Sequence, residues 1–359
     1  YDIALNTNTI GPSRLLRFAK KCTKLSLFLH VSTAYVNGDR QGRSMEKPLL
    51  MGQSIAAERS FCSEDHVPEL NVDAEVELAS TLAETFHVKE VNQKMKDLGL
   101  QRARMFGWKN TYQFTKAMAE MVISESREQI PVVIIRPSAI ESTYKEPFPG
   151  WIQGNKVLDP LILQYGKGNL PVLVGDCQAV IDVIPVDMVV NATLAAMAKN
   201  GISRKPEVNV YHMGSSDMNP VLWGDIFKFC YEHFIGCPLM KTEIKKLEFL
   251  KSMDEYLTYI YNVMRPRELK TSPDIELHQK LHKQAKRKVE YLIQLANLYK
   301  PYMFDHGLFD SSNMRKMMEE MSLEEEKNFG FNVGNINWKD YISNIHIPGL
   351  KTHILKERF

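Results

Sequence analysis

The chain has 359 residues, a formal net charge of +2 at pH 7, and 44% hydrophobic and 25% charged residues. This composition is ordinary for a globular protein, and it excludes a collagen-like repeat, a disulfide miniprotein and a long disordered tail. The near-neutral charge gives no whole-molecule attraction to nucleic acid. The five cysteines are odd in number and show no CxxC spacing, so we expect reduced thiols in an intracellular protein and no metal site.

The first 140 residues alternate between predicted helices and strands. An apolar face over residues 5–21 predicts a helix, and the short apolar run 25–31 is typical of a buried parallel strand. Helical spacing of apolar residues over 64–106 predicts one or two helices. A further helix over 111–128 and a strand over 132–135 follow. This order of elements predicts an α/β protein with a parallel sheet.

The pattern continues downstream before it changes. Further elements are predicted there: short strands near 171–174 and 180–184, a helix over 187–199 and a strand over 208–212. Residues 241–300 then hold 13 Lys and Arg against 8 Asp and Glu, and helical spacing dominates there. We therefore expect a domain boundary at Pro238, between an α/β domain over 1–239 and a helical domain over 240–359.

The beginning of the chain is unusual. It carries no Met, no signal peptide and no transit peptide, and it starts as though inside an amphipathic helix. We expect that an N-terminal portion of the first domain is missing from this sequence. No segment reaches the roughly 18 apolar residues that a membrane-spanning helix needs.

The strongest local motif is Tyr112-Gln113-Phe114-Thr115-Lys116. On a helix, side chains four residues apart share one face at roughly 5–6 Å. A phenol has a pKa of about 10, and a nearby ammonium lowers that value, so the pair is typical of a tuned general acid. The YxxxK pattern alone would occur about once by chance in a chain of this composition, and a solvated pair on a surface helix is the simpler explanation.

The context of the motif favours a site. Thr33 follows the first predicted strand, and the end of the next strand carries Pro137 and Ser138. Side chains at the carboxyl ends of parallel strands are where open α/β sheets build binding sites. Asn8 adds an amide on the preceding helix. For Thr33 and Asn8, helix capping is the ordinary alternative role.

Taken in this order, these elements resemble the extended short-chain dehydrogenase/reductase superfamily. Within it, the sequence is similar to the plant alcohol-forming fatty acyl-CoA reductases, also known as male-sterility-type proteins. The resemblance covers essentially the whole chain, and Thr33 and Tyr112 lie 79 positions apart, a longer separation than in sugar-nucleotide members. The more specific matches are residues 107–118, 145–152, 298–302 and 341–350.

The resemblance implies NADPH-dependent reduction of a long-chain fatty acyl-CoA to a primary alcohol through a bound aldehyde, for wax, suberin or pollen-wall lipids. Tyr112 would be the general acid, and Lys116 would lower its pKa and hold the nicotinamide ribose. Thr33 would bind the same substrate oxygen, and Asn8 would support the site through its helix. Pro137 and Ser138 would contact the cofactor.

One departure limits the resemblance. The family carries a GxxGxxG turn whose backbone N–H groups approach the cofactor pyrophosphate, and the sequence has none. We therefore expect a Rossmann-like parallel sheet without its first βαβ portion, followed by a mainly α-helical C-terminal region. The alternatives are a truncated, inactive binding protein and another extended short-chain enzyme, such as a sugar-nucleotide epimerase.

A basic helical segment and the expected substrate both bear on where the protein resides in the cell. Residues 283–293 begin basic and turn apolar, which is compatible with a peripheral helix on an anionic membrane or with a solvated helix docked on its own domain. A long-chain acyl-CoA substrate favours the endoplasmic reticulum membrane surface, with the plastid as the alternative.

Overall fold

The computed structural model describes residues 1–40, 42–59, 68–87, 90–263 and 275–356, with the side chains of 275–282 left out. The described chain forms two compact units, each built from separate stretches of sequence. The first unit comprises 1–140, 182–219 and 307–335, and the second comprises 141–181, 220–306 and 336–359. The two units interleave along the chain, so neither ends at the boundary predicted at 239/240, and that domain boundary stays a prediction.

The first unit contains a three-stranded parallel sheet in the order β1 (Phe28–Val31), β3 (Val132–Pro137) and β8 (Val208–Met213). Its register pairs Leu29 with Val133, and Val133 with Asn209. Every residue of the central strand β3 is buried, as expected for a parallel strand that is covered on both faces. The predicted α/β fold with a parallel sheet is therefore confirmed.

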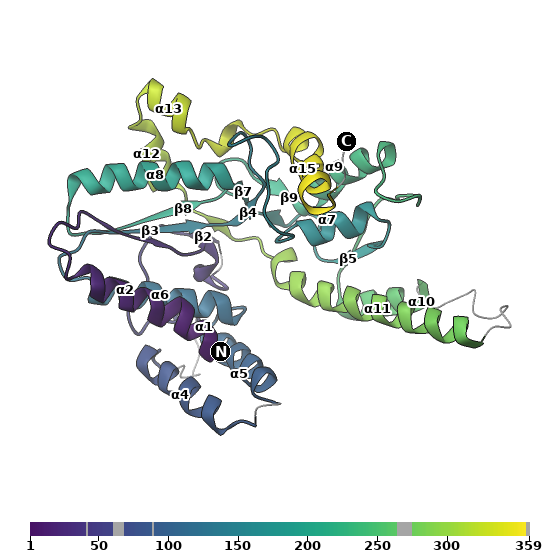
Figure 1. The fold of residues 1–359 in the computed structure, drawn as a ribbon, viewed down its shortest axis with the longest axis horizontal. Helices are drawn as coiled ribbons and strands as arrows, with labels where there is room; N and C mark the ends of the chain where they lie inside the picture. The colour runs from purple at the N-terminus through teal and green to yellow at the C-terminus, as the bar shows by residue number, and fades with distance from the viewer. Residues whose placement is uncertain (41, 60–67, 88–89, 264–274, 357–359) are drawn as a thin grey trace. The chain divides into compact units, whose positions relative to one another are not determined.

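Helices cover both faces of this sheet (Figure 1). On one face, α2 (Gly11–Ala19) and α6 (Thr111–Ser126) pack together, and α8 (Val186–Ser203) covers the other. Leu16 and Ile123 from the first pair bury their side chains against β3. A second core joins the aromatic rings of Phe106, Trp108 and Phe114, which fixes the start of α6.

The segment before α6 is fixed by backbone geometry. Gly107 has φ +92°, and a Cβ there would lie 2.6 Å from the backbone nitrogen of Ala56, so only glycine fits. Trp108 then donates its indole N–H to the carbonyl of Val36 at 2.7 Å. Asn110 caps α6 by accepting the N–H of Gln113 at 2.9 Å. These contacts place the first turn of α6 next to the segment that follows β1.

Arg136, in the central strand β3, is completely buried, and each of its three guanidinium nitrogens has a polar partner. Its Nε donates to Glu120 at 2.9 Å, its Nη2 donates to the carbonyl of Lys47 at 2.9 Å, and its Nη1 lies 3.2 Å from His212 Nε2. His212 Nδ1 lies 2.8 Å from the carbonyl oxygen of Asp310. Burial, followed by the charge of Arg136, lowers the pKa of His212 to about 3, so the ring is neutral.

The N-terminal helical segment is not a regular α-helix. After α1 (Asp2–Leu5), residues Asn6–Ile10 (η1) form a π-helical turn that leads into α2. The prediction of one or two helices over 64–106 is confirmed within the described residues, which form α4 (Val72–Thr85) and α5 (Val91–Met105). The remaining elements of the first unit are η2 (Ala34–Asn37), β2 (Arg43–Ser44), α3 (Ile55–Arg59), β7 (Val183–Pro185), β11 (Leu308–Phe309), α12 (Ser312–Glu319), α13 (Leu323–Phe329) and η5 (Val333–Asn335).

The second unit is mainly helical, with two small sheets. One pairs β5 (Val172–Val174) with β10 (Glu248–Leu250) in parallel, and the other pairs β6 (Val180–Ile181) with β9 (Val221–Leu222). Strand β4 (Ala139–Glu141), which pairs with β7, leads the chain into this unit. Its helices are α7 (Asp159–Gly166), α9 (Trp223–Gly236), α10 (Met253–Val263), α11 (Ile275–Met303), α14 (Trp338–Asp340), η6 (Tyr341–His346), α15 (Ile347–Gly349) and η7 (Leu350–Ile354).

The basic helical stretch predicted over 283–293 lies within α11. Its neighbouring apolar side chains, Leu292, Leu295 and Ala296, are buried, and Lys288 Nζ donates to Asn169 Oδ1 at 2.7 Å. The apolar side of this helix is therefore packed within the protein, which favours the docked-helix interpretation. Among the described residues, no helix combines the length and apolar character that crossing a membrane requires.

Candidate active site

Thr33 lies just beyond the carboxyl end of β1, and its side chain is buried. Its hydroxyl donates to the carbonyl of Pro137 at 3.4 Å and accepts the N–H of Tyr35 at 3.4 Å, so Thr33 also caps the short helix η2. The structure thus combines two roles that the sequence left as alternatives: Thr33 caps a helix, and it stands at the strand end where sites form.

Tyr112 lies in the first turn of α6, with 50% of the residue exposed. Its phenol lies near the Thr33 side chain. Partial burial raises the pKa of Tyr112, and the Thr33 side chain only partly opposes this effect. The phenol is consequently protonated at neutral pH, and it is accessible to a ligand.

The prediction that Lys116 lowers the pKa of that phenol is wrong for this structure. Lys116 Nζ donates to the carbonyl of Val31 at 2.9 Å, and the pKa of Tyr112 is raised instead of lowered. Burial lowers the pKa of Lys116 itself, with Glu120 opposing. The reason is geometric. The ammonium group of Lys116 is hydrogen-bonded to the end of β1, so its positive charge lies beside the edge of that strand.

Asn8 acts on the helix that carries the tyrosine. Its Nδ2 donates to Thr115 Oγ1 at 3.0 Å, and the neighbouring Thr9 hydroxyl donates to the carbonyl of Thr115 at 2.8 Å. The π-helical turn brings these two consecutive side chains to one residue of α6. Since π turns often occur at functional sites, this local irregularity agrees with a positioning role for Asn8.

Ser138 lies at the end of β3, where its N–H donates to the carbonyl of Met213 at 2.8 Å. Its hydroxyl is buried and has no hydrogen-bond partner among the described residues, and the same is true of Ser32 Oγ and His30 Nε2. Buried polar groups are normally paired, so these orphaned atoms at the ends of β1 and β3 fit a polar ligand such as a nicotinamide ribose.

Sequence reasoning missed His30 and Ser32. Both are buried; His30 lies in β1 and Ser32 directly follows its last residue. Burial lowers the pKa of His30 to about 4, so its ring is neutral at pH 7. The position of both residues at the carboxyl end of a predicted parallel strand was the signal that could have identified them.

The fold is that of a Rossmann-like protein, and Tyr112 and Lys116 lie on one helix beside the carboxyl end of its parallel sheet. The terminal R domain of the myxalamid biosynthetic pathway shares the fold, with a TM-score of 0.55 at 15% identity, over 96% of this chain and 62% of that one. An NAD-binding family model described as "Male sterility protein" matches residues 1–193, and a second model with the same description matches 275–357.

Several curated relatives are plant enzymes. Fatty acyl-CoA reductase 2, chloroplastic, of Arabidopsis thaliana is 49% identical over 100% of this chain and 60% of the relative. Fatty acyl-CoA reductase 1 of the same plant is 39% identical over 99% and 74%. The alcohol-forming fatty acyl-CoA reductase of Simmondsia chinensis is 36% identical over 99% and 73%. The chain belongs to the male sterility family of fatty acyl-CoA reductases, and it spans between 60% and 74% of the length of these relatives.

Proposed function

We propose that this chain carries the proton-donating site of an NADPH-dependent reductase that converts a long-chain fatty acyl-CoA to a primary alcohol. The observation that supports the proposal is that the Tyr112 phenol lies near the Thr33 side chain at the carboxyl end of the sheet. The names of the relatives support the acyl-CoA substrate and the alcohol product. When bound, the reduced nicotinamide would supply the hydride for both reductions.

Residues of this chain would orient the carbonyl oxygen of the substrate and donate a proton to it. Tyr112 would donate its proton to the carbonyl oxygen as negative charge develops there, and Thr33 would orient that oxygen. The raised pKa of Tyr112 suits this direction, because a reduction consumes a proton that the phenol must hold beforehand. In the first reduction the C–S bond to CoA breaks and an aldehyde forms, and in the second the aldehyde becomes the alcohol.

Three further residues would hold the cofactor or the geometry. Ser138 would offer its orphaned hydroxyl to the cofactor beside Pro137, and Lys116 would bind the nicotinamide ribose after leaving the carbonyl of Val31. Asn8 would keep the first turns of α6 in place through Thr115. These roles rest on the resemblance and on the contacts of the free site.

The experiment replaces Tyr112 by Phe in the protein that carries this chain, supplied with NADPH and palmitoyl-CoA. Loss of one general acid should lower alcohol formation about 10²–10⁴-fold, while NADPH binding stays within about twofold. Tyr35→Phe is the matched control, because this tyrosine lies two residues after Thr33 and packs its ring edge-on against Phe309. Full activity in Tyr112→Phe would refute the proposal.

We further propose a plastid location, on the printed name of the chloroplastic relative, with the endoplasmic reticulum surface as the alternative. A fluorescent fusion of the full-length protein, imaged with plastid and reticulum markers, separates the two. Coincidence with the reticulum marker alone would overturn the plastid proposal.

A further inference from the structure

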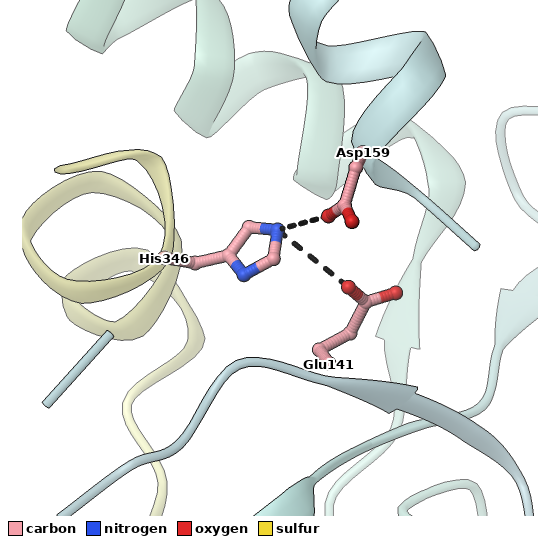
Figure 2. Close-up of side chains that lie close together, drawn as sticks. All are labelled: Glu141, Asp159 and His346. Atoms are coloured by element: carbon pink, nitrogen blue, oxygen red, sulfur yellow. Dashed lines mark ion pairs between the residues drawn. The ribbon is translucent and has the colours of Figure 1, made fainter. Parts of the chain in front are cut away.

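Within the second unit, two carboxylates and an imidazole meet in the protein interior (Figure 2). Glu141 ends β4, Asp159 begins α7 and His346 ends η6, and their side chains are at most 1% exposed. His346 Nε2 lies 3.2 Å from Asp159 Oδ1 and 3.6 Å from Glu141 Oε2. These three atoms have no hydrogen-bond partner among the described residues. Three buried lone-pair-bearing atoms thus face one point.

The outer oxygens of both carboxyl groups are held by backbone N–H groups. Leu158 N–H donates to Glu141 Oε1 at 3.2 Å, and Lys156 N–H donates to Asp159 Oδ2 at 2.8 Å. Both donors belong to the loop that leads into α7, so this loop fixes the two carboxyl groups together. Each group therefore presents its remaining oxygen to the shared point, which is the arrangement by which neighbouring hydrogen bonds orient metal ligands.

The histidine is oriented by a second set of hydrogen bonds. Tyr341 donates its hydroxyl to the carbonyl of Ser142 at 2.7 Å, and the two hydroxyls lie 3.3 Å apart. Ser142 can then donate to the Tyr341 oxygen and accept from His346 Nδ1, which lies at 2.9 Å. This chain of bonds can hold the proton on Nδ1, and the lone pair of Nε2 then points toward the carboxyl groups.

The charge of the cluster is not balanced by a basic side chain. Among the described residues, no lysine or arginine forms an ion pair with Glu141 or Asp159, and only His346 does so. Two buried carboxylates therefore need either a proton or a cation between them.

We propose that Glu141, Asp159 and His346 bind a divalent first-row transition ion of the Zn²⁺ class. Ligand atoms about 2.0–2.2 Å from a tetrahedral ion lie about 3.4 Å apart. The separations of 3.2 Å and 3.6 Å agree with this value, and all three atoms lie within 4.8 Å of one another. Two carboxylate oxygens and one imidazole nitrogen suit Zn²⁺ better than Mg²⁺, and the ion would neutralise the pair.

The test measures metal in the full protein, purified without chelator, by elemental analysis. We expect about one equivalent of zinc, and rebinding of Zn²⁺ by the stripped protein, with circular dichroism confirming the fold. Glu141→Gln and Asp159→Asn keep the side-chain shape and should weaken Zn²⁺ binding about 100-fold or more. Ser142→Ala keeps all three ligands but removes the support of His346, so a loss of about 10–100-fold is expected.

His306→Gln is the matched control, because His306 also lies 3.3 Å from a carboxylate, Asp176, but on the surface and in no group of possible metal ligands within the described part of the chain. Its zinc content should equal that of the unchanged protein. The proposal is overturned if the protein binds no Zn²⁺, or if folded Glu141→Gln binds it as tightly as the unchanged protein. Metal content is measured without reference to alcohol formation, so failure of the proposed reductase activity leaves this test intact.

Discussion

Two buried histidine clusters, one in each unit, differ in what faces the ring nitrogen Nε2. In the first, His212 Nε2 lies 3.2 Å from the guanidinium of Arg136, which Glu120 neutralises in turn. In the second, His346 Nε2 faces the carboxyl groups of Glu141 and Asp159 and no basic group among the described residues. The first cluster contains its own cation, so it is complete as folded, whereas the second lacks one. The difference shows which of the two needs a group from outside the chain.

The largest effect should come from breaking the complete cluster with Glu120→Gln. This change leaves Arg136 charged, buried and without its anion, and we expect a loss of about 3–5 kcal/mol in unfolding free energy, measured by urea denaturation. Lys199→Met, which breaks an exposed ion pair with Glu320 in the same unit, is the control and should cost under about 1 kcal/mol. Equal costs would show that the buried pair is not special.

The next largest effect concerns His30, whose Nε2 is also unpartnered but which belongs to no group of possible metal ligands among the described residues. Its pKa is lowered to about 4, so the unfolded state binds more protons between pH 4 and 6.5. Its contribution to stability is present above pH 6.5 and is lost as pH falls toward 4, by up to about 3 kcal/mol. His30→Gln should flatten urea-derived stability across this window, and an unchanged slope would contradict the assignment.

A smaller effect is expected for Asn8→Ala, which removes the bond to Thr115 but no group that touches substrate. Loss of one such bond costs about 1 kcal/mol, equivalent to about fivefold in a rate or an equilibrium constant. Alcohol formation should therefore fall by about that factor through kcat, with KM for NADPH unchanged. Asn8→Asp, which can still accept but not donate, should fail to restore the rate. A change in KM alone would argue against a positioning role.

The smallest effect should be Glu141→Gln in metal-free protein at pH 7. Burial and the charge of Asp159 raise the pKa of Glu141, which favours the neutral carboxyl group, so a neutral amide should cost under about 1 kcal/mol by urea denaturation. The same change from Glu to Gln should therefore cost little unfolding free energy at Glu141 and much more at Glu120. A cost as large as that of Glu120→Gln would mean that Glu141 is charged without an ion.

Local sequence patterns predicted the sheet and the tyrosine helix because each depends on residues close together in the chain. The strand β3 and the helix α6 were predicted within two residues of their observed ends. The hydrogen bond between Lys116 and the carbonyl of Val31 was not predicted, because it depends on how far α6 stands from the strand edge. Hence the pKa of Tyr112 was predicted in the wrong direction.

Other features were beyond local reasoning altogether. Glu141 and His346 are separated by more than half of the chain, so no spacing rule could bring them together, and the sequence predicted no metal site. The interleaving of the two units along the chain could not be predicted for the same reason. A shift in composition near Pro238 indicates local helical character, but it does not indicate which segments pack together. Contacts between residues that are far apart in the chain are determined by the tertiary fold.

The π-helical turns have a consequence for insertions and deletions. Asn8 lies in one such turn and His346 ends another, so each residue depends on a local change in helical phase. Because a π turn holds about one residue more than an α turn, deleting one residue from Asn6–Ile10 would leave a regular α turn and would rotate the residues before it only slightly. Tyr1, whose hydroxyl donates to Glu75 at 2.7 Å, would then stay in the core, whereas Asn8 and Thr9 would lose their shared approach to Thr115. Each π turn therefore shifts the helical phase locally, so that one helical segment can pack an apolar face and also present a side chain to a polar site.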